Sequence, residues 1–294
     1  LRQLRVLDPA CGSGAFLVYA LERVADRRRA LGDPANIATI RRDVLTRSVF
    51  GVDRDPTAVW LCELRLWLSV VIESEETDPL RVTPLPNLDR NIRVGDALSG
   101  SAFDGEWRIT GGRQVVAMRQ RYARATGGRK RTLARALDRE ERRRAIAQLD
   151  REIEGARHAR QERLASQRTR DLFGEPIPAS AESRAEARRL RDALRAFRAE
   201  RRRLADGGAL PFSFTACFAD VHAAGGFHVV IGNPPWVRLH RIPEALRQQL
   251  RRGYAVFRGA AWEAGAASAR ASTGFASQVD LAALFVERSL ALAR

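Results

Sequence analysis

The chain contains one residue group whose types and spacing are specific for a chemical task, Ile231-Gly-Asn-Pro-Pro-Trp236. Two consecutive prolines fix the backbone and supply no N–H, so they hold a carbonyl outward as an acceptor, and Asn233 adds a side-chain carbonyl. An exocyclic adenine amine donates two hydrogens, and accepting both leaves its lone pair aimed at an electrophile. Trp236 offers a flat face on which an extruded base can stack. The alternative interpretation is a rigid turn with a core tryptophan.

A second group, Asp8-Pro-Ala-Cys-Gly-Ser-Gly14, stands between an apolar stretch and a helical pattern. Gly12 and Gly14 allow a sharp turn and a close approach of the backbone to a ligand. The turn leads into a helix amino terminus, which favours a negatively charged group such as a carboxylate. The Asp-Pro-Ala-Cys prefix and the strand–turn–helix setting favour cofactor binding over an ordinary turn.

Two further acids follow predicted strands, Asp53 in Gly51-Val-Asp-Arg-Asp-Pro56 and Asp96 in Val94-Gly-Asp-Ala-Leu98. An acid such as Asp53 can accept hydrogen bonds from both ribose hydroxyls of an adenosine, and Asp96 is placed to accept one from an adenine amino group. Asp53 comes 45 residues after Asp8, whereas a dinucleotide fold usually places its acid about 20 residues on. The spacing therefore favours an adenosyl cofactor over NAD, and the alternative role of Asp53 is a helix cap.

The elements that must position these groups alternate along the chain. Short apolar runs predict strands over 4–8, 49–53, 91–95 and 227–232, and helical periodicity predicts helices over 15–29, 37–46, 56–72, 243–254 and 280–293. Strands separated by helices imply an α/β fold with a parallel sheet. Residues 259–278 are small and polar and predict a loop.

The segment 113–206 differs from the rest of the chain. It is rich in Arg, Ala, Leu and Glu, and its apolar residues recur at helical spacing on both sides of Gly174-Glu-Pro-Ile-Pro178. This pattern predicts two antiparallel helices in a coiled-coil-like hairpin, with Arg201 on the seam. The segment carries 27 Lys and Arg against 14 Asp and Glu. It is either a nucleic-acid contact or a solvated spacer.

Composition narrows the class of protein. The net charge of +16 indicates a polyanionic partner, although a strongly GC-biased genome would also encode many arginines. Three distant cysteines argue against a disulfide framework or a zinc site, and the four histidines are not paired at ligand spacing, so no metal is expected. Neither a membrane span nor a secretory leader is visible, and we expect a cytoplasmic location.

The motifs and their order resemble the N6-adenine DNA methyltransferases of bacterial restriction-modification and phage-defence systems. The gamma-type order fits, because the cofactor loop precedes the Asn-Pro-Pro-aromatic motif, and the fit is best with large methylases of the Type IIG kind. Asp280-Leu-Ala-Ala-Leu-Phe-Val-Glu287 resembles the helix that follows the catalytic loop in those proteins. The resemblance covers residues 1–99 and 210–294.

The resemblance implies a class I S-adenosylmethionine-dependent methyltransferase fold, which is a Rossmann-like doubly wound sheet, here with an α-helical hairpin insertion. Three parts follow: 1–112 binds the cofactor, 113–206 is the basic helical insertion, and 207–294 carries the catalytic strand, loop and following helix. Only four strands are found where this fold has seven. We therefore expect a fragment of a longer protein, with missing flanking regions that include a target-recognition domain.

The resemblance also assigns residues to two sites. The S-adenosylmethionine pocket would be lined by Asp8, Pro9, Ala10, Cys11, Gly12, Ser13, Gly14, Phe16, Asp53, Arg54, Asp96 and Ala97. The flipped adenine would be held by Asn233, Pro234, Pro235 and Trp236, with direct in-line methyl transfer. Some relatives have a larger residue at the position of Ala97, where it covers the cofactor adenine.

The implied partner is double-stranded DNA, with a fused or separate restriction nuclease and no membrane. Three alternatives stay open. Enzymes that methylate a protein glutamine or ribosomal RNA also use Asn-Pro-Pro-aromatic, but their cofactor loop usually lacks Asp-Pro-Ala-Cys. Enzymes that methylate the cytosine amine more usually have serine at the position of Asn233. The third alternative is a non-catalytic DNA-binding scaffold.

Overall fold

The structure is a computed structural model that describes residues 1–72, 84–98, 112–166, 180–238, 241–258 and 280–294. These residues form two compact units, which we call the α/β unit (Leu1–Leu137 with Phe212–Arg294) and the hairpin unit (Asp138–Pro211). No helix within the described ranges is both long enough and apolar enough to cross a membrane.

The α/β unit contains a parallel sheet whose described strands lie in the order β3-β2-β1-β4. The strands are β1 (Val6–Asp8), β2 (Val49–Asp53), β3 (Ile92–Val94) and β4 (Val229–Val230). Each of them was predicted from its apolar run. β4 is shorter than the predicted 227–232, because Phe227 makes an isolated parallel bridge with Ala293 instead of pairing with β1.

Successive residues of β2 pack on opposite faces of the sheet, as a strand requires. Val49 belongs to the cluster of buried side chains formed with the three helices α1 (Ala15–Ala30), α2 (Ile37–Arg47) and α3 (Pro56–Val71). Phe50 belongs to the cluster on the other face, which includes Leu284 and Phe257. Helices therefore cover both faces, and this explains why the strands are mostly apolar.

The second face is covered by helices from the last third of the chain. These are α7 (Phe214–Cys217), α8 (Ala219–His222), α9 (Glu244–Gly253), α10 (Ala255–Arg258) and α11 (Leu281–Leu292). The predicted helices over 243–254 and 280–293 are confirmed as α9 and α11. The helices α7, α8 and α10 were not predicted, since four residues are too few to establish a period. The predicted loop 259–278 lies outside the described residues.

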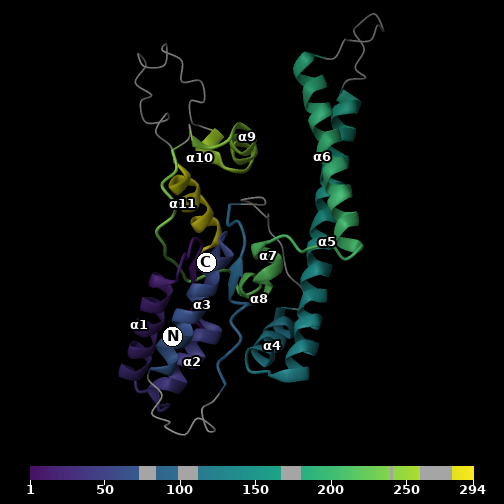
Figure 1. Ribbon diagram of the computed structural model, residues 1–294. Helices are drawn as coiled ribbons and strands as arrows, with labels where there is room; N and C mark the ends of the chain where they lie inside the picture. Colours follow the sequence, from purple (N-terminus) through teal and green to yellow (C-terminus); the bar gives the residue numbers. More distant parts are fainter. Residues whose placement is uncertain (73–83, 99–111, 167–179, 239–240, 259–279) are drawn as a thin grey trace, which may run out of the picture. The chain divides into compact units, whose positions relative to one another are not determined.

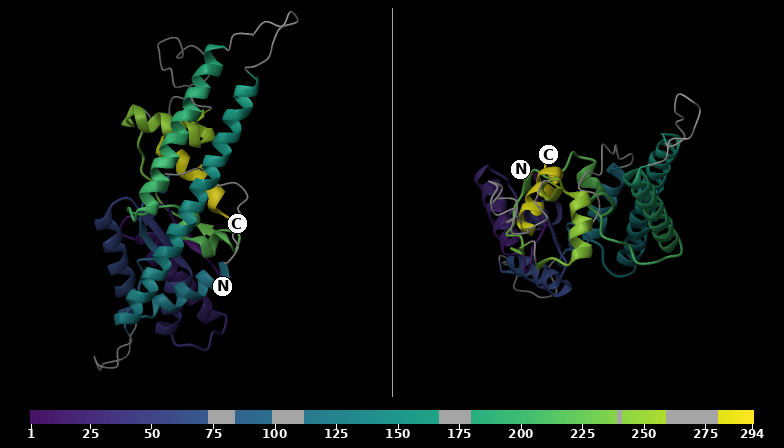
Figure 2. Two further views of the ribbon diagram at one scale, coloured as in Figure 1. Left: turned by 90° about the vertical axis from the view of Figure 1, so that its right-hand side faces the viewer. Right: turned by 90° about the horizontal axis from the view of Figure 1, so that it is seen from above.

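The hairpin unit consists of two antiparallel helices, α5 (Gly127–Ser166), which begins in the α/β unit, and α6 (Ala181–Ala205). Figures 1 and 2 show them side by side. Arg163, near the end of α5, pairs with Glu186, near the start of α6, at 2.6 Å. Nearer the other end of the hairpin, Asp150 pairs with Arg201 at 2.5 Å. The ion pair explains how Arg201 occupies the seam, where its charge would otherwise lack a partner.

The hairpin was predicted within a segment bounded at 113 and 206. The structure contains a further helix at its start, α4 (Gly112–Ala123), which belongs to the α/β unit. The break predicted at 174–178 falls in the gap between α5 and α6, outside the described residues. The functional division at 112 and 206 stays a prediction.

A substitution at the centre of the sheet tests this packing. Leu7 is completely buried in β1, within the cluster that joins the sheet to α11. We expect Leu7→Ala to lower the free energy of unfolding by about 2–5 kcal/mol, because the removed methyl groups leave a cavity. The exposed Leu68→Ala of α3 is the matched control and should change it by less than about 0.5 kcal/mol. Equal denaturant midpoints for the two variants would contradict this description of the core.

Candidate functional site

The strand order places two of the sequence motifs at one point of the sheet. The chain runs outward from β1 to β2 and β3, then returns to place β4 on the other side of β1. The strands are parallel, so the loops after β1 and β4 leave the same edge side by side. This is a topological switch point, where open α/β sheets bind their ligands.

The two motifs are in direct contact at this edge. The N–H of Ile231 donates to the carbonyl of Leu7 at 2.8 Å, which continues the β1–β4 pairing by one residue. A Cβ atom at Gly232 would lie 2.6 Å from Oδ1 of Asp8. Only glycine therefore fits at position 232 while the Asp8 carboxyl keeps its place. Gly232 was quoted within the motif, but its role could not be derived from the sequence.

The loop that follows β1 is held by its own turn and by β2. The Asp8 side chain accepts from the N–H of Ala10 at 3.0 Å, and the N–H of Cys11 donates to the carbonyl of Val52 at 3.0 Å. The N–H of Gly12 donates to Oδ2 of Asp53 at 2.8 Å. The carboxylate at the end of β2 therefore anchors the loop that follows β1.

Gly12 and Gly14 both have positive φ, +52° and +82°, but for different reasons. A Cβ at Gly14 would lie 2.5 Å from Sγ of Cys62 in α3, so this glycine allows close packing behind the loop. A Cβ at Gly12 would meet nothing within 4 Å. Gly12 therefore faces open space, where its bare backbone can approach a ligand.

Groups from α3 support the loop and were missed by the sequence reasoning. Cys11 and Cys62 are buried, and hydrogen bonding to Cys62 together with burial raises the pKa of the Cys11 thiol. Cys11 is thus a neutral packing group and not a nucleophile. On the outer side, the Arg65 guanidinium donates to Oγ of Ser13 at 3.0 Å. Arg65 lies three residues after Cys62 in α3, and only this spacing could have linked the two residues to one helix face.

The loop ends at the amino terminus of α1. Gly14 is the N-cap and has no side chain that could accept from the first turn. The first backbone N–H groups of the helix are therefore available to an anion. Phe16, in this first turn, is exposed. The predicted cofactor residues Asp8 to Phe16 thus form one continuous turn around a helix terminus.

The ends of β2 and β3 are tied together. Oδ1 of Asp53 accepts from the N–H of Asp55 at 2.9 Å, and the carbonyl of Asp53 accepts from the N–H of Gly95 at 2.8 Å. Oδ1 of Asp96 accepts from the N–H of Leu98 at 2.9 Å, and its Oδ2 lies 3.8 Å from Nε of the exposed Arg54. Asp53, Arg54 and Asp96 therefore lie together, beside the loop after β1.

Ala97 differs from Asp53, Arg54 and Asp96 because it is buried. Its side chain is buried in the cluster on the second face of the sheet, with Leu98 and Phe214. A contact between Ala97 and a bound adenine stays a prediction, because this residue is only 3% exposed in the structure.

The loop after β4 presents an aromatic ring to solvent. Trp236 is 74% exposed, so it is not the core tryptophan of the alternative interpretation. Its Nε1–H donates to Oδ1 of Asn233 at 3.2 Å. The carbonyl of Pro235 accepts from the N–H of Val237 at 3.2 Å, and the carbonyl of Val237 then accepts from Leu281 at the start of α11. The motif is thus anchored at both ends, with its polar and aromatic groups outward.

An apolar cavity of about 330 Å³ lies beside the two loops. Its walls include Pro9 and Ala10 from the first loop, Gly232 and Pro234 from the second, and Phe285 from α11. The structure thus places the loops after β1 and β4 side by side at one edge of the sheet.

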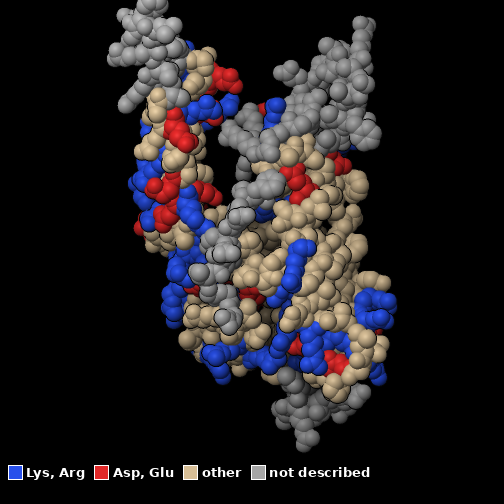
Figure 3. All heavy atoms as spheres, turned by 180° about the vertical axis from the view of Figure 1, so that it is seen from behind, with Lys and Arg blue, Asp and Glu red and all other residues tan. Residues whose placement is uncertain are grey.

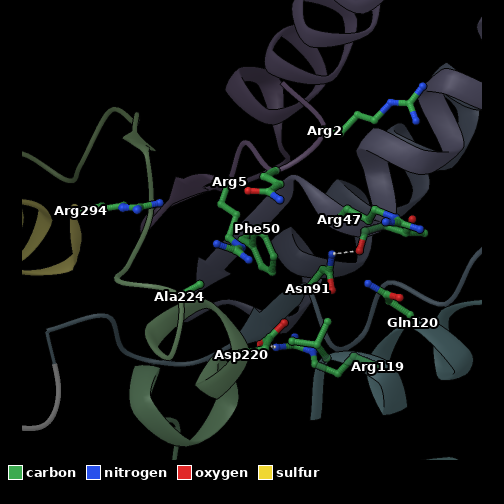
Figure 4. Close-up of a pocket in the computed structure, with 13 residues that line it drawn as sticks. Arg2, Arg5, Arg47, Phe50, Asn91, Arg119, Gln120, Asp220, Ala224 and Arg294 are labelled. Carbon is green, nitrogen blue, oxygen red and sulfur yellow. Dashed lines mark hydrogen bonds and ion pairs between the residues drawn. The ribbon is translucent and has the colours of Figure 1, made fainter. Parts of the chain in front are cut away.

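A second pocket of about 500 Å³ lies at the opposite edge of the sheet, since its walls include Arg5, Arg47 and Asn91, which lie just before β1, β2 and β3. Figure 4 shows its arginines. Arg47 is paired with Asp43 at 2.7 Å, and Arg119 is paired with Asp220 at 2.5 Å. The first pair lies within α2 and the second joins α4 to α8. This basic pocket is at the other edge of the sheet, so it is not part of the site described above.

Because Asp8 is buried, we expect an unusual pH dependence of the free energy of unfolding. Its side chain is 1% exposed, and burial, with a smaller contribution from Asp53, raises its pKa from 3.8 to about 6. A carboxyl whose pKa is raised in the folded state binds more protons folded than unfolded between about pH 4 and 6, so stability falls as the pH rises through this range, by about 3 kcal/mol. Asp8→Asn should abolish this fall and raise the melting temperature at pH 7.5.

The exposed Asp26→Asn of α1 removes the same charge and should leave the pH profile of the melting temperature unchanged. If the melting temperature of Asp8→Asn changes with pH in the same way as that of the unsubstituted protein, burial does not raise the pKa of Asp8 and this prediction is wrong.

Comparison with known families agrees with the geometry. Residues 47–294 match the family described as Eco57I restriction-modification methylase, and residues 2–80 match the one described as N-6 DNA Methylase. A putative type II restriction enzyme and methyltransferase of Methanocaldococcus jannaschii is 35% identical over 106 residues, which is 34% of this chain and 9% of that protein. The type II restriction enzyme and methyltransferase RM.Eco57I of Escherichia coli is 32% identical over 110 residues, 32% of this chain and 11% of that protein.

The matched segments thus span about a tenth of these relatives. The family match covers far more than half of the chain and includes the ends of β2, β3 and β4. This chain belongs to the Eco57I restriction-modification methylase family.

Proposed function

We propose that this chain is the catalytic part of an S-adenosylmethionine-dependent methyltransferase that methylates the N6 amine of adenine in a specific sequence of double-stranded DNA. Family membership supports adenine methylation of DNA. The description of the relatives as restriction enzyme and methyltransferase supports a role in restriction-modification or phage defence. The observation that carries the proposal is the contact between the loops after β1 and β4, through Gly232 and Asp8.

The residues after β1 fit a cofactor with an amino-acid carboxylate and an adenosine. The uncapped amino terminus of α1 suits the carboxylate, and the bare backbone at Gly12 allows close approach. Asp53 uses each carboxylate oxygen for one backbone N–H, and each oxygen retains a lone pair for a ribose hydroxyl. Asp96 and Arg54 are the groups we assign to the adenine end.

The assignment of these residues to the cofactor is consistent with a class I methyltransferase fold. The sheet β3-β2-β1-β4 would be part of that fold. In our proposal residues 1–112 bind the cofactor and residues 207–294 bind the base. A target-recognition region and a restriction nuclease, in the same polypeptide or as a partner, would complete the system, in keeping with the names of the relatives.

The base would be held by the loop after β4. A duplex hides the adenine amine, so the base must leave the stack before it can reach this edge of the sheet. The exposed indole of Trp236 provides the stacking face. Asn233 and the carbonyls of Pro234 and Pro235 are the acceptors for the amine. The 3.2 Å bond from Trp236 to Asn233 would be exchanged for a bond from the base when adenine is captured.

When bound, S-adenosylmethionine supplies a methyl group on a sulfonium centre, and no covalent enzyme intermediate is required. The chain's residues contribute mainly by positioning, because they hold the amine on the line of attack. Carbonyl dipoles at Asn233 and Pro234 stabilise the positive charge that develops on the amine.

Asn233 and Trp236 test the base-binding role. Asn233→Ala should abolish methyl transfer while leaving cofactor affinity largely intact, because the lost acceptor acts mainly in the transition state. Trp236→Ala should weaken base capture and rate, since stacking is worth about 1–3 kcal/mol for a base. Trp236→Phe should retain substantial activity. The measurement is nucleoside mass spectrometry of DNA methylated by the full-length protein.

Exposed Trp60→Ala on α3 is the control for loss of a surface tryptophan and should leave transfer unchanged. N4-methylcytosine as the sole product, or methyl groups on RNA or protein and none on DNA, would overturn the substrate assignment.

Asp53 tests the cofactor role. Asp53→Ala removes the acceptor of the Gly12 N–H and the expected ribose contacts. Hydrogen bonds to a charged group contribute about 1.5–3 kcal/mol each, so cofactor affinity measured by calorimetry should fall at least tenfold. Asp55→Ala, which removes only the cap of α3, should reduce stability by about 1 kcal/mol and keep cofactor affinity. Unchanged affinity in Asp53→Ala would exclude this residue from the pocket.

A further inference from the structure

One face of α6 carries a regular row of arginines, which we call the arginine stripe. Its members recur at alternating spacings of four and three residues, so on an α-helix they lie within a narrow arc. All of them are exposed. They are Arg184, Arg188, Arg191, Arg195, Arg198 and Arg202.

The stripe lies away from the seam of the hairpin. Leu194 and Leu204 are buried, and Arg201 forms its ion pair with Asp150 on α5. At 100° per residue, these seam positions are about a quarter turn or more around the helix from the middle of the stripe. The stripe is therefore not needed to hold the two helices together.

Most of the stripe has no acidic partner. Within the described parts of the chain, Arg184, Arg188, Arg198 and Arg202 form no ion pair. Arg191 and Arg195 share one acid, Asp192, at the loose distances of 3.6 and 4.0 Å.

Several other arginines of the hairpin unit are ion-paired with an acid of the same helix. Arg143 pairs with Glu140 at 2.7 Å, and Arg203 pairs with Glu200 at 2.6 Å, each within one helical turn. Figure 3 shows basic and acidic side chains intermixed along the hairpin on the face that it draws. Such mixed surfaces are typical of solvated helices, whereas a row of one sign repels itself unless a partner neutralises it.

The stripe has the dimensions of a nucleic-acid contact. From Arg184 to Arg202 the helix advances by roughly 27 Å, which corresponds to about eight base-pair steps of 3.4 Å. Exposed alanines stand beside the stripe at positions 181, 185 and 199. These short side chains leave room for a phosphate backbone to approach the helix.

We propose that the arginine stripe of α6 binds the phosphate backbone of double-stranded DNA. Guanidinium groups form bidentate hydrogen bonds with phosphate oxygens. Apart from Asp192, the stripe and its flanks consist of arginine and alanine, so the contact positions the duplex and does not select its sequence. The proposal rests on the proposed function in one respect, that DNA is the substrate.

The test compares two variants of the full-length protein that lose the same charge. The stripe variant carries Arg184→Gln, Arg188→Gln, Arg198→Gln and Arg202→Gln. The control carries Arg143→Gln, Arg157→Gln, Arg163→Gln and Arg203→Gln, whose arginines are ion-paired in the structure. Glutamine is a good helix former, so α6 should stay helical, which circular dichroism checks.

Affinity for a 30-base-pair duplex is measured by fluorescence anisotropy between 50 and 300 mM salt. Each phosphate contact adds about 0.9 to the slope of log affinity against log salt, so the stripe variant should lose about 3 to 4 from this slope and bind at least tenfold more weakly at 100 mM. The control should lose less than about 1. Replacing the same four stripe residues with lysine should restore most of the slope, because the charge is kept.

Equal slopes for the stripe variant and the control would overturn the proposal, as would a loss of affinity for single-stranded RNA with none for duplex DNA. Nucleoside mass spectrometry on the unsubstituted protein separates this outcome from failure of the proposed function. If the unsubstituted protein methylates adenine and the stripe variant has the same salt slope as the control, only the proposal for the stripe is rejected. If DNA is not methylated but the slope of the stripe variant is reduced, only the substrate assignment is rejected.

Discussion

The site depends on the pairing of β4 with β1, two strands that are more than 200 residues apart in the chain. Because they run parallel, their carboxyl ends meet, and the loops that follow them share one edge. A shift of one residue in this register would turn Val229 and Val230 to the wrong faces and would move Asn233 away from the loop after β1. The close approach of Gly232 to the Asp8 carboxyl disfavours such a shift, because a slipped register would place a side chain at that point.

Asp8 is buried at this edge of the sheet, although a charged carboxylate is more stable in water. The carboxyl is almost fully buried, and its one described backbone donor does not offset the burial. Behind it, the buried Cys62 packs against Gly14 and the buried Cys11 packs against Gly51. A proton on Asp8, or a hydrogen-bond donor beside it, would reduce the free-energy cost of burying this carboxyl. Folded proteins often retain such a locally unfavourable group where it serves their function.

Much of the architecture could be predicted because its signals are local. The apolar runs of β1 and β2 and the periodicity of α1, α3 and α11 need no knowledge of distant residues. The turn from Asp8 to Gly14 was recognised from glycine and its setting. Arg65, Cys62 and the role of Gly232 could not be found this way, because each acts through a contact with a residue far along the chain. The bond between Trp236 and Asn233 depends on rotamers, which no sequence pattern encodes.

The long connection between β3 and β4 has an evolutionary consequence. The entropy of closing a loop grows only with the logarithm of its length, so a lineage can lengthen, shorten or replace the segment that contains α5 and α6 with little effect on the strands that it joins. The residues at the strand ends are then free of selection for whatever the inserted helices do. A chemistry shared by many relatives can thus be combined with a helical module that each lineage adapts separately.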